Sequence, residues 1–276
     1  MRSYLKTKDY SVSGEEFELV YDPRFDMLIT KPQPEQMERY YKSEAYISHT
    51  DAKASMLDKL YQLVKKYSLG QKIRLANKHT TLIDSVLDVG AGTGDFLIAA
   101  KNRGWKVEGV EPNINARDLA KEKGLTLKKS LNEIGSGGFD LITLWHVLEH
   151  VPNLEQQIRS LEGVLNEQGT LLVAVPNYKS FDAKHYKEHW AAYDVPRHLW
   201  HFSKTAIERL FFQHGLKVVK IKPMVFDSFY VSLLSEKYKT GTHNYMKAVA
   251  IGLWSNIVSL LSKESSSQIY VLKKHK

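Results

Sequence analysis

The most informative stretch of the sequence is Val86-Leu87-Asp88-Val89-Gly90-Ala91-Gly92-Thr93-Gly94-Asp95-Phe96. It predicts a buried strand that runs into a glycine loop, followed by a helix that begins near Asp95. Glycines let the backbone turn sharply and come close to a ligand, and a helix N-terminus offers unpaired N–H groups. The stretch therefore predicts a ligand site at the carboxyl end of a strand.

The spacing of the three glycines distinguishes between two kinds of ligand. The dinucleotide fingerprint G-x-G-x-x-G/A, read from Gly90, places Asp95 at its last position, where its carboxylate would face a pyrophosphate. The spacing here is G-x-G-x-G, and Asp88 stands two residues before it. S-adenosylmethionine (SAM) has no phosphate, and an acidic strand end suits its ammonium group. The spacing thus favours SAM over NAD.

A second acidic residue stands where a nucleoside ligand would need it. Residues 106–110 read as the next strand, and Glu111 follows that strand directly. The distance from the last glycine is close to the ~20 residues expected for an acid that accepts hydrogen bonds from ribose hydroxyls. A helix-capping acid is the alternative. With loop, strand and acid in register, we favour the ribose contact.

Apolar and amphipathic segments alternate from about residue 85 onward, which predicts an α/β fold with a doubly wound, mainly parallel sheet. Two segments lie outside this alternation. Residues 1 to about 50 form an N-terminal appendage and lid segment that precedes the main domain, residues 51–276, and short strands are predicted in it at 17–21 and 27–30. Residues 223 to about 265 form a helical insertion before the last strand. The predicted strands are 85–89, 106–110, 125–128, 139–144, 169–175, 216–222 and 268–273, and the predicted helices are 95–103, 115–123, 154–165 and 204–214.

Composition limits the class of protein and its partners. The absence of cysteine excludes disulfides, a thiol nucleophile and a cysteine-bound zinc. The formal net charge is +8, but the lysines are spread along the chain, which indicates a solvated basic surface. No apolar run reaches the ~18 residues of a membrane span, and the polar start is unlike a signal peptide. Residues 246–261 predict a helix that packs on the core or caps the site, with contact to a membrane surface as the alternative. We expect a cytoplasmic monomer or homodimer.

Three motifs resemble those of the class I SAM-dependent methyltransferase superfamily. Residues 87–94 resemble its first motif, and Gly109-Val110-Glu111-Pro112 resembles its second. Residues 139–142, followed by His146-Val147-Leu148-Glu149-His150-Val151, are similar to the fourth-strand motif of small-molecule methyltransferases, including the ubiquinone-biosynthesis O-methyltransferases. The resemblance covers roughly residues 84–222 and the final strand. It implies a Rossmann-like, seven-stranded sheet whose last strand is antiparallel, with SAM as cofactor.

The resemblance also implies which residues contact the cofactor. Residues 40–49 are similar to a lid segment in relatives whose aromatic side chains close over SAM. The cofactor-binding residues are then expected to be Asp88, Gly90, Gly92, Gly94, Glu111, Pro112, Trp145, His146, Tyr46 and His49. In some sugar- and polysaccharide-pathway relatives the N-terminal module holds zinc on paired cysteines. This chain has none, so we expect packing alone to hold its appendage.

Candidate catalytic residues follow the fourth and fifth strands. Residues 185–201 are crowded with aromatic and histidine side chains, and sheets of this kind bind ligands at the carboxyl ends of their strands. A histidine of near-neutral pKa can deprotonate a hydroxyl as it attacks the methyl group. The candidates are His146, His198, His201 and Tyr193, and a packing role remains open for each histidine.

His146, Glu149 and His150 also match the H-x-x-E-H pattern of zinc proteases. The motif has about one helical turn between a strand and Pro152, and no third ligand can be assigned. We therefore expect no metal. The alternative is that Glu149 and His150 hold a divalent cation, as the resemblance to ubiquinone-pathway enzymes suggests.

The same position indicates the class of acceptor. Methyltransferases that act on nucleic-acid bases share an Asn/Asp-Pro-Pro-aromatic segment here, whereas this chain has Trp145-His146-Val147-Leu148. The prediction is methyl transfer to oxygen, carbon or nitrogen of a small molecule, in the sugar, lipid or quinone/phenolic class, with no nucleic-acid partner. The alternatives are an NAD-dependent oxidoreductase and a SAM-binding protein without catalytic activity.

Overall fold

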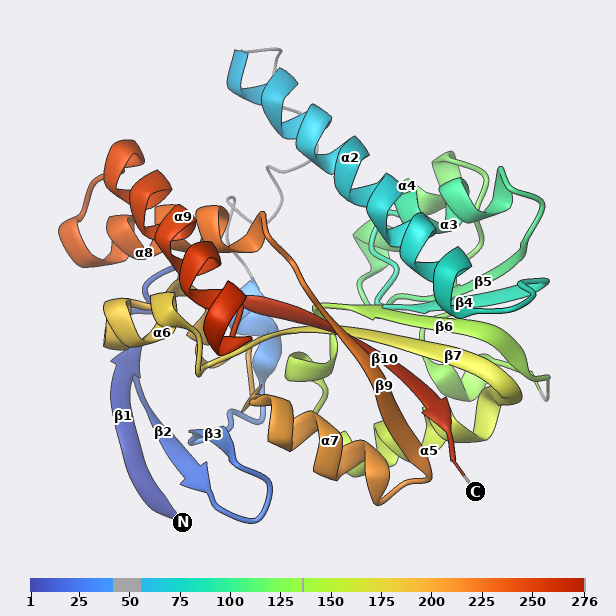
Figure 1. The fold of residues 1–276 in the computed structure, drawn as a ribbon, viewed down its shortest axis with the longest axis horizontal. Coiled ribbons are helices and arrows are strands. Elements are labelled where there is room, and N and C mark those ends of the chain that lie inside the picture. The colour runs from blue at the N-terminus through green and yellow to red at the C-terminus, as the bar shows by residue number, and fades with distance from the viewer. Residues whose placement is uncertain (42–55, 136, 276) are drawn as a thin grey trace.

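A six-stranded sheet forms the centre of the computed structural model, which describes residues 1–41, 56–135 and 137–275. Its strand order is β5-β4-β6-β7-β10-β9 (Figure 1). The first four strands of this order run parallel, and β10 is antiparallel to both of its neighbours. The strands are β4 (Ser85–Val89), β5 (Lys106–Val110), β6 (Phe139–Trp145), β7 (Leu165–Pro176), β9 (Leu216–Pro223) and β10 (Ser267–Lys274).

The described part of the sheet has one strand fewer than predicted. Residues 125–128 alternate in burial, which is why they read as a strand, but Lys128 alone pairs with β5, opposite Val110. A turn at Gly124 precedes the segment, and a short 3-10 helix, η2 (Leu131–Glu133), follows it. These flanking turns leave too little extended chain beside β5 for a strand, although Leu125 and Leu127 are still buried against the sheet.

Helices cover both faces of the sheet (Figure 1). The alternation of side chains along a strand sends Val86 to one face and Leu87 to the other. Helices on the Val86 side contribute residues such as Ile73 and Phe96, and helices on the Leu87 side contribute residues such as Ile158. The first group is α2 (Met56–His79), α3 (Asp95–Lys101) and α4 (Ile114–Glu122), and the second is α5 (Leu154–Val164) and α7 (Lys204–Phe212).

The N-terminal appendage is a second, antiparallel sheet with the order β1-β2-β3-β8. The sequence predicted β2 and β3 but missed β1, and it missed that two residues near position 200 would complete this sheet as β8. The inner side of this sheet packs on residues 178–195. Trp190 and Tyr40 are among the largest buried side chains of the core cluster formed there. The elements involved are β1 (Arg2–Lys8), β2 (Glu16–Asp22), β3 (Met27–Lys31), η1 (Met37–Tyr41), α6 (Phe181–Tyr186), η4 (Lys187–His189), η5 (Ala191–Tyr193) and β8 (Trp200–His201).

The insertion before β10 is a hairpin of two helices, α8 (Asp227–Thr240) and α9 (Tyr245–Ser262). The apolar helix α9 is 18 residues long, a length and composition that would also suit a membrane span, and 22% of it is buried. The expectation that it packs on the core holds only for its small residues, because most of its large apolar side chains face solvent.

Candidate active site

The glycine loop follows β4 and has the backbone that its sequence requires. Gly90, Gly92 and Gly94 have φ angles of 72°, 54° and 80°, a region that favours glycine. A Cβ at Gly90 would lie 2.3 Å from Val147 Cγ2, and one at Gly94 would lie 2.4 Å from Leu125 Cδ1. A Cβ at Gly92 would meet no atom of the described residues within 4 Å. The outer glycines thus allow close packing, and the middle one faces open space.

Glu111 connects this loop to the end of β5. Its two carboxylate oxygens accept hydrogen bonds of 2.9 Å from the backbone N–H groups of Gly92 and Asn113. The side chain is therefore held at the rim of the loop, and each oxygen retains a lone pair. Pro112 follows it, and its carbonyl oxygen accepts a 2.7 Å bond from Arg117.

Asp88 lies beneath the loop and is almost fully buried. Thr143 donates a 2.5 Å hydrogen bond to its Oδ1. Burial raises the pKa of Asp88 to about 7, and the Thr143 bond and the Lys72 charge only partly oppose this. The Asp88 carboxyl therefore changes from its neutral to its charged form near neutral pH in the free protein.

Lys72, on α2, was missed by the sequence analysis. Its Nζ lies 4.3 Å from the centre of the Trp145 ring, a cation–π distance. Burial lowers the pKa of Lys72, whereas the charges of Asp88 and Asp227 act to raise it. A cation that is influenced by the charges of two carboxylates thus lies beside the predicted Trp145. A single lysine on an amphipathic helix gives no signal of this in the sequence.

His146 follows β6 with a φ of 58° and lies between two carboxylates. Its Nε2 is 2.9 Å from Asp227 Oδ2, and its Nδ1 is 3.3 Å from Glu149 Oε1. Burial alone would lower the pKa of His146, but the two carboxylates outweigh it and raise the pKa to about 10. Sequence reasoning missed Asp227 because it lies 81 positions away, at the start of α8. Both ring nitrogens face carboxylates, which differs from the zinc-protease arrangement.

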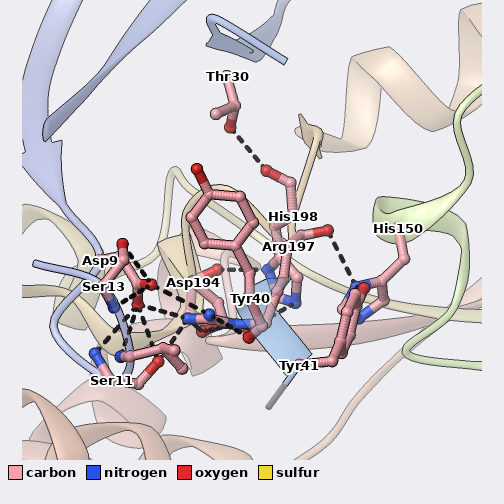
Figure 2. A network of polar contacts seen from close by, with 12 residues as sticks. Asp9, Ser11, Ser13, Thr30, Tyr40, Tyr41, His150, Asp194, Arg197 and His198 are labelled. Carbon is pink, nitrogen blue, oxygen red and sulfur yellow. Dashed lines mark hydrogen bonds and ion pairs between the residues drawn. The ribbon is translucent and has the colours of Figure 1, made fainter. Parts of the chain in front are cut away.

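Glu149, His150 and His198 form a second cluster next to His146. One possible ligand atom of each lies within 4.8 Å of the others, in the described residues. The Nδ1 atoms of His150 and His198 lie 3.0 and 2.9 Å from the carbonyl oxygens of Arg197 and Ala192, to which they donate. Figure 2 shows the contact between His150 and Arg197, and His198 Nε2 lies 4.0 Å from Asp194 Oδ2. Glu149 Oε2 is buried and has no hydrogen-bond partner within residues 1–41, 56–135 and 137–275. Two imidazoles and a carboxylate are ligands that suit a transition-metal ion.

His201 belongs to β8 of the N-terminal sheet, and Tyr193 lies in the core that this sheet covers. His201 Nε2 is 3.0 Å from Thr30 Oγ1, and burial holds its pKa well below the usual range. Tyr193 is 2% exposed and packs edge-on against Trp190 and His201. Their assignment as catalytic residues stays a prediction. Tyr46 and His49 lie outside the described residues.

A buried ion network joins the N-terminal sheet to this region (Figure 2). Arg197 is 2% exposed, and its Nη2 lies 2.9 Å from Asp9 Oδ1 and 2.7 Å from Asp194 Oδ1. Its Nη1 donates a 3.0 Å bond to the carbonyl oxygen of Tyr40, in η1. The expectation that packing alone holds the appendage was therefore incomplete, because charges separated by most of the chain also hold it.

The fold and the glycine loop define the class I SAM-dependent methyltransferases, a class that the comparisons with known proteins support. The family model of the methyltransferase domain matches residues 46–221, and the chain belongs to this family. This supports SAM, and not NAD, as the cofactor.

Curated relatives extend the likeness over part of the chain. An enzyme of Coxiella burnetii named ubiquinone biosynthesis O-methyltransferase is 31% identical over 116 residues, which are 39% of this chain and 47% of the relative. The chain therefore spans about half the length of the curated relatives it matches.

Two solved structures have the same fold at low sequence identity. The StiE O-methyltransferase domain matches with a TM-score of 0.55 at 14% identity, over 80% of this chain and 78% of that one. A mycolic acid cyclopropane synthase, solved with S-adenosylhomocysteine and CTAB, matches with a TM-score of 0.52 at 14% identity, over 74% of this chain and 83% of that one. At such identities the likeness concerns the fold alone.

Proposed function

We propose that this protein transfers the methyl group of SAM to a hydroxyl of a small-molecule acceptor, in the sugar, lipid or quinone/phenolic class. The observation that carries the proposal is the position of His146 beside the glycine loop. Val147 packs directly on Gly90, so its neighbour His146 lies where the end of β6 meets that loop. The O-methyltransferase names of the curated relatives agree with a hydroxyl acceptor.

The cofactor is proposed to lie across the glycine loop. The ribose hydroxyls would donate to the remaining lone pairs of Glu111, and the open space at Gly92 would receive the methionine portion. The ammonium and sulfonium charges would lie toward Asp88 and Trp145, the place that Lys72 holds in the free protein. In this arrangement the positive charges of SAM take the place of the Lys72 ammonium group.

Replacing Lys72 with methionine should therefore tighten SAM binding. The variant keeps the length of the side chain but removes the competing charge, and we expect a Kd lower by about two- to fivefold. Calorimetric titration measures it, with Lys66→Met on the same helix as the control. An unchanged or weaker affinity in Lys72→Met alone would show that Lys72 does not compete with the cofactor.

The chemistry asked of the protein is mainly positioning. In-line displacement at the methyl carbon needs the nucleophile, methyl group and sulfur to be aligned and water to be excluded. An acceptor hydroxyl that takes the place of Asp227 at His146 Nε2 would remove one interaction that raises the pKa of the imidazole. The imidazolium would then release its Nε2 proton to solvent before the reaction, and the neutral ring would accept the proton of the hydroxyl at Nε2 as the oxygen attacks the methyl carbon and the methyl–sulfur bond breaks.

Replacing His146 with alanine should separate catalysis from cofactor binding. We expect kcat to fall by about 10²–10⁴-fold, because a general base contributes about that much, while the Kd of SAM changes little. Release of S-adenosylhomocysteine is measured with phenolic, catechol and sugar-nucleotide acceptors. His243→Ala, at an exposed histidine in the turn between α8 and α9, serves as the matched control. Unchanged kcat in His146→Ala would remove its assigned role, and SAM binding without turnover of any acceptor would favour a non-catalytic binding protein.

The division of the chain is proposed in the same terms. Residues 1–50 would form the N-terminal module and lid segment, and residues 51–276 would form the SAM-binding domain with its helical hairpin. The separate sheet β1-β2-β3 supports a module, although β8 comes from the main domain. Arg197 would then act as the joint between the two, and His201 and Tyr193 would support that joint by packing.

A further inference from the structure

The helix α9 is oriented opposite to the usual pattern of a globular protein. Its buried residues are small or polar: Ala248, Gly252, Ser255 and Ser259. Large apolar residues recur every three or four positions on its outer side and are exposed, with Met246 at 86% and Leu261 at 90%. Helices of soluble domains normally turn such a stripe toward the core. The outer stripe comprises Met246, Val249, Leu253, Trp254, Ile257, Leu260 and Leu261.

The start of α8 extends this stripe into a wider surface. Asn256 donates a 3.0 Å hydrogen bond to the carbonyl oxygen of Val225, and Ser228 donates a 3.1 Å bond to that of Gly252. Val225, Phe226 and Tyr230 are exposed there. We call these three residues and the outer stripe of α9 the apolar face. Contiguous exposed apolar surface of this kind marks an interaction site.

The exposed charges of the α8–α9 hairpin have one sign. The acidic residues between positions 224 and 263 are Asp227 and Glu236. Asp227 pairs with His146, and Glu236 is buried with its Oε1 3.1 Å from Lys247 Nζ. The exposed charged residues of the hairpin are Lys237, Lys239 and Lys263, at the two ends of the face. Apolar residues flanked by cations suit a bilayer with anionic headgroups.

The connections of α9 fit a helix that lies on a membrane. Residues 241–244 join it to α8, and β10 of the central sheet begins at Ser267 (Figure 1). The inner side is also anchored, because Ser255 Oγ donates a 2.7 Å bond to the buried Asp182. The helix could not cross a bilayer without losing these contacts.

We propose that the apolar face docks this protein on the surface of an anionic lipid bilayer. A two-fold dimer through the same face is less favourable, because each copy would present the same lysines to its partner. Docking would also bring the start of α8 to the bilayer, and Asp227, the partner of His146, lies there. The inference concerns lipid contact and does not depend on the proposed methyl transfer.

Vesicle flotation tests the proposal on the full chain. Wild-type protein is mixed with vesicles of phosphatidylcholine, or of phosphatidylcholine with phosphatidylglycerol, and the bound fraction is measured. We expect binding to the anionic vesicles that is at least tenfold stronger than to the neutral ones, and that weakens with added salt. The double variant Leu253→Glu/Leu261→Glu should bind the anionic vesicles at least tenfold more weakly than the wild type does. Both side chains face solvent, so the fold should tolerate the change.

The matched control is Leu82→Glu, at an exposed leucine outside the apolar face. It should bind vesicles as the wild type does, and circular dichroism checks that all variants are folded. Failure of the wild type to bind either kind of vesicle would overturn the proposal, as would equal binding to neutral vesicles. A dimer in sedimentation experiments that Leu253→Glu/Leu261→Glu dissociates, without vesicle binding, would assign the face to a second copy instead.

Discussion

Replacing Arg197 with leucine is expected to lower the free energy of unfolding by about 3–5 kcal/mol, the usual cost of removing one partner from a buried ion pair. Arg197 and Asp9 are both almost fully buried, so the variant leaves the Asp9 carboxylate without its cation (Figure 2). Asp194, which also contacts Arg197, loses the same partner. Urea unfolding followed by circular dichroism measures the change.

The pH dependence of this loss gives a second readout. Although burial alone would raise the pKa of Asp9, Arg197 and the backbone N–H groups of Ser11 and Ser13 lower it below the ordinary value. A lowered pKa stabilises the folded state above the unfolded pKa of ~4, and this stabilisation is lost as the pH falls through the folded pKa. The difference in the free energy of unfolding between the wild type and Arg197→Leu should therefore become smaller as the pH falls below ~4.

Arg159→Leu is the control for this experiment. Its ion pair with Glu155 is exposed, at 3.4 Å, and should contribute at most about 0.5 kcal/mol. Equal, small losses in both variants would mean that the buried network does not hold the N-terminal sheet in place.

Replacing Glu111 with alanine is expected to weaken SAM binding by about 10²-fold. A hydrogen bond to a charged group contributes about 1.5–3 kcal/mol, and the proposed site uses Glu111 for two ribose hydroxyls. The variant also removes the acceptor for the N–H groups of Gly92 and Asn113, which loosens the loop. Calorimetry measures the Kd.

Glu108→Ala, on the strand β5 that precedes Glu111, is the matched control because its side chain is exposed, and it should leave the Kd unchanged. Glu111→Gln retains one acceptor oxygen and should fall between the wild type and Glu111→Ala. A Kd in Glu111→Ala within about twofold of the wild type would remove Glu111 from the site, since one such bond alone contributes more.

The sequence predicted the parts of the site that lie close together in the chain. The glycine loop and Glu111 fall within one strand–helix–strand unit, where the residue types are dictated by local backbone geometry. Residues that contact each other only in the tertiary fold could not be paired from the sequence pattern. Asp227 reaches His146 from another helix, and Asp9 reaches Arg197 across 188 positions.

Two errors about the fold have a similar origin. The alternating pattern of residues 125–128 reflects burial on one side, which a turn-flanked loop provides as well as a strand does. The composition of α9 indicated burial, but composition does not reveal which side of a helix meets the protein. Gly252 and Ser255 are spaced so that they lie on one side of the helix. Small residues on that side indicated close packing there, with the large apolar residues on the outer side.

Calorimetric titration of the wild-type protein with SAM, S-adenosylhomocysteine and NAD distinguishes a methyltransferase from an oxidoreductase. We expect micromolar binding of SAM or S-adenosylhomocysteine at one site and no binding of NAD. Binding of NAD with no response to either SAM or S-adenosylhomocysteine would contradict this expectation.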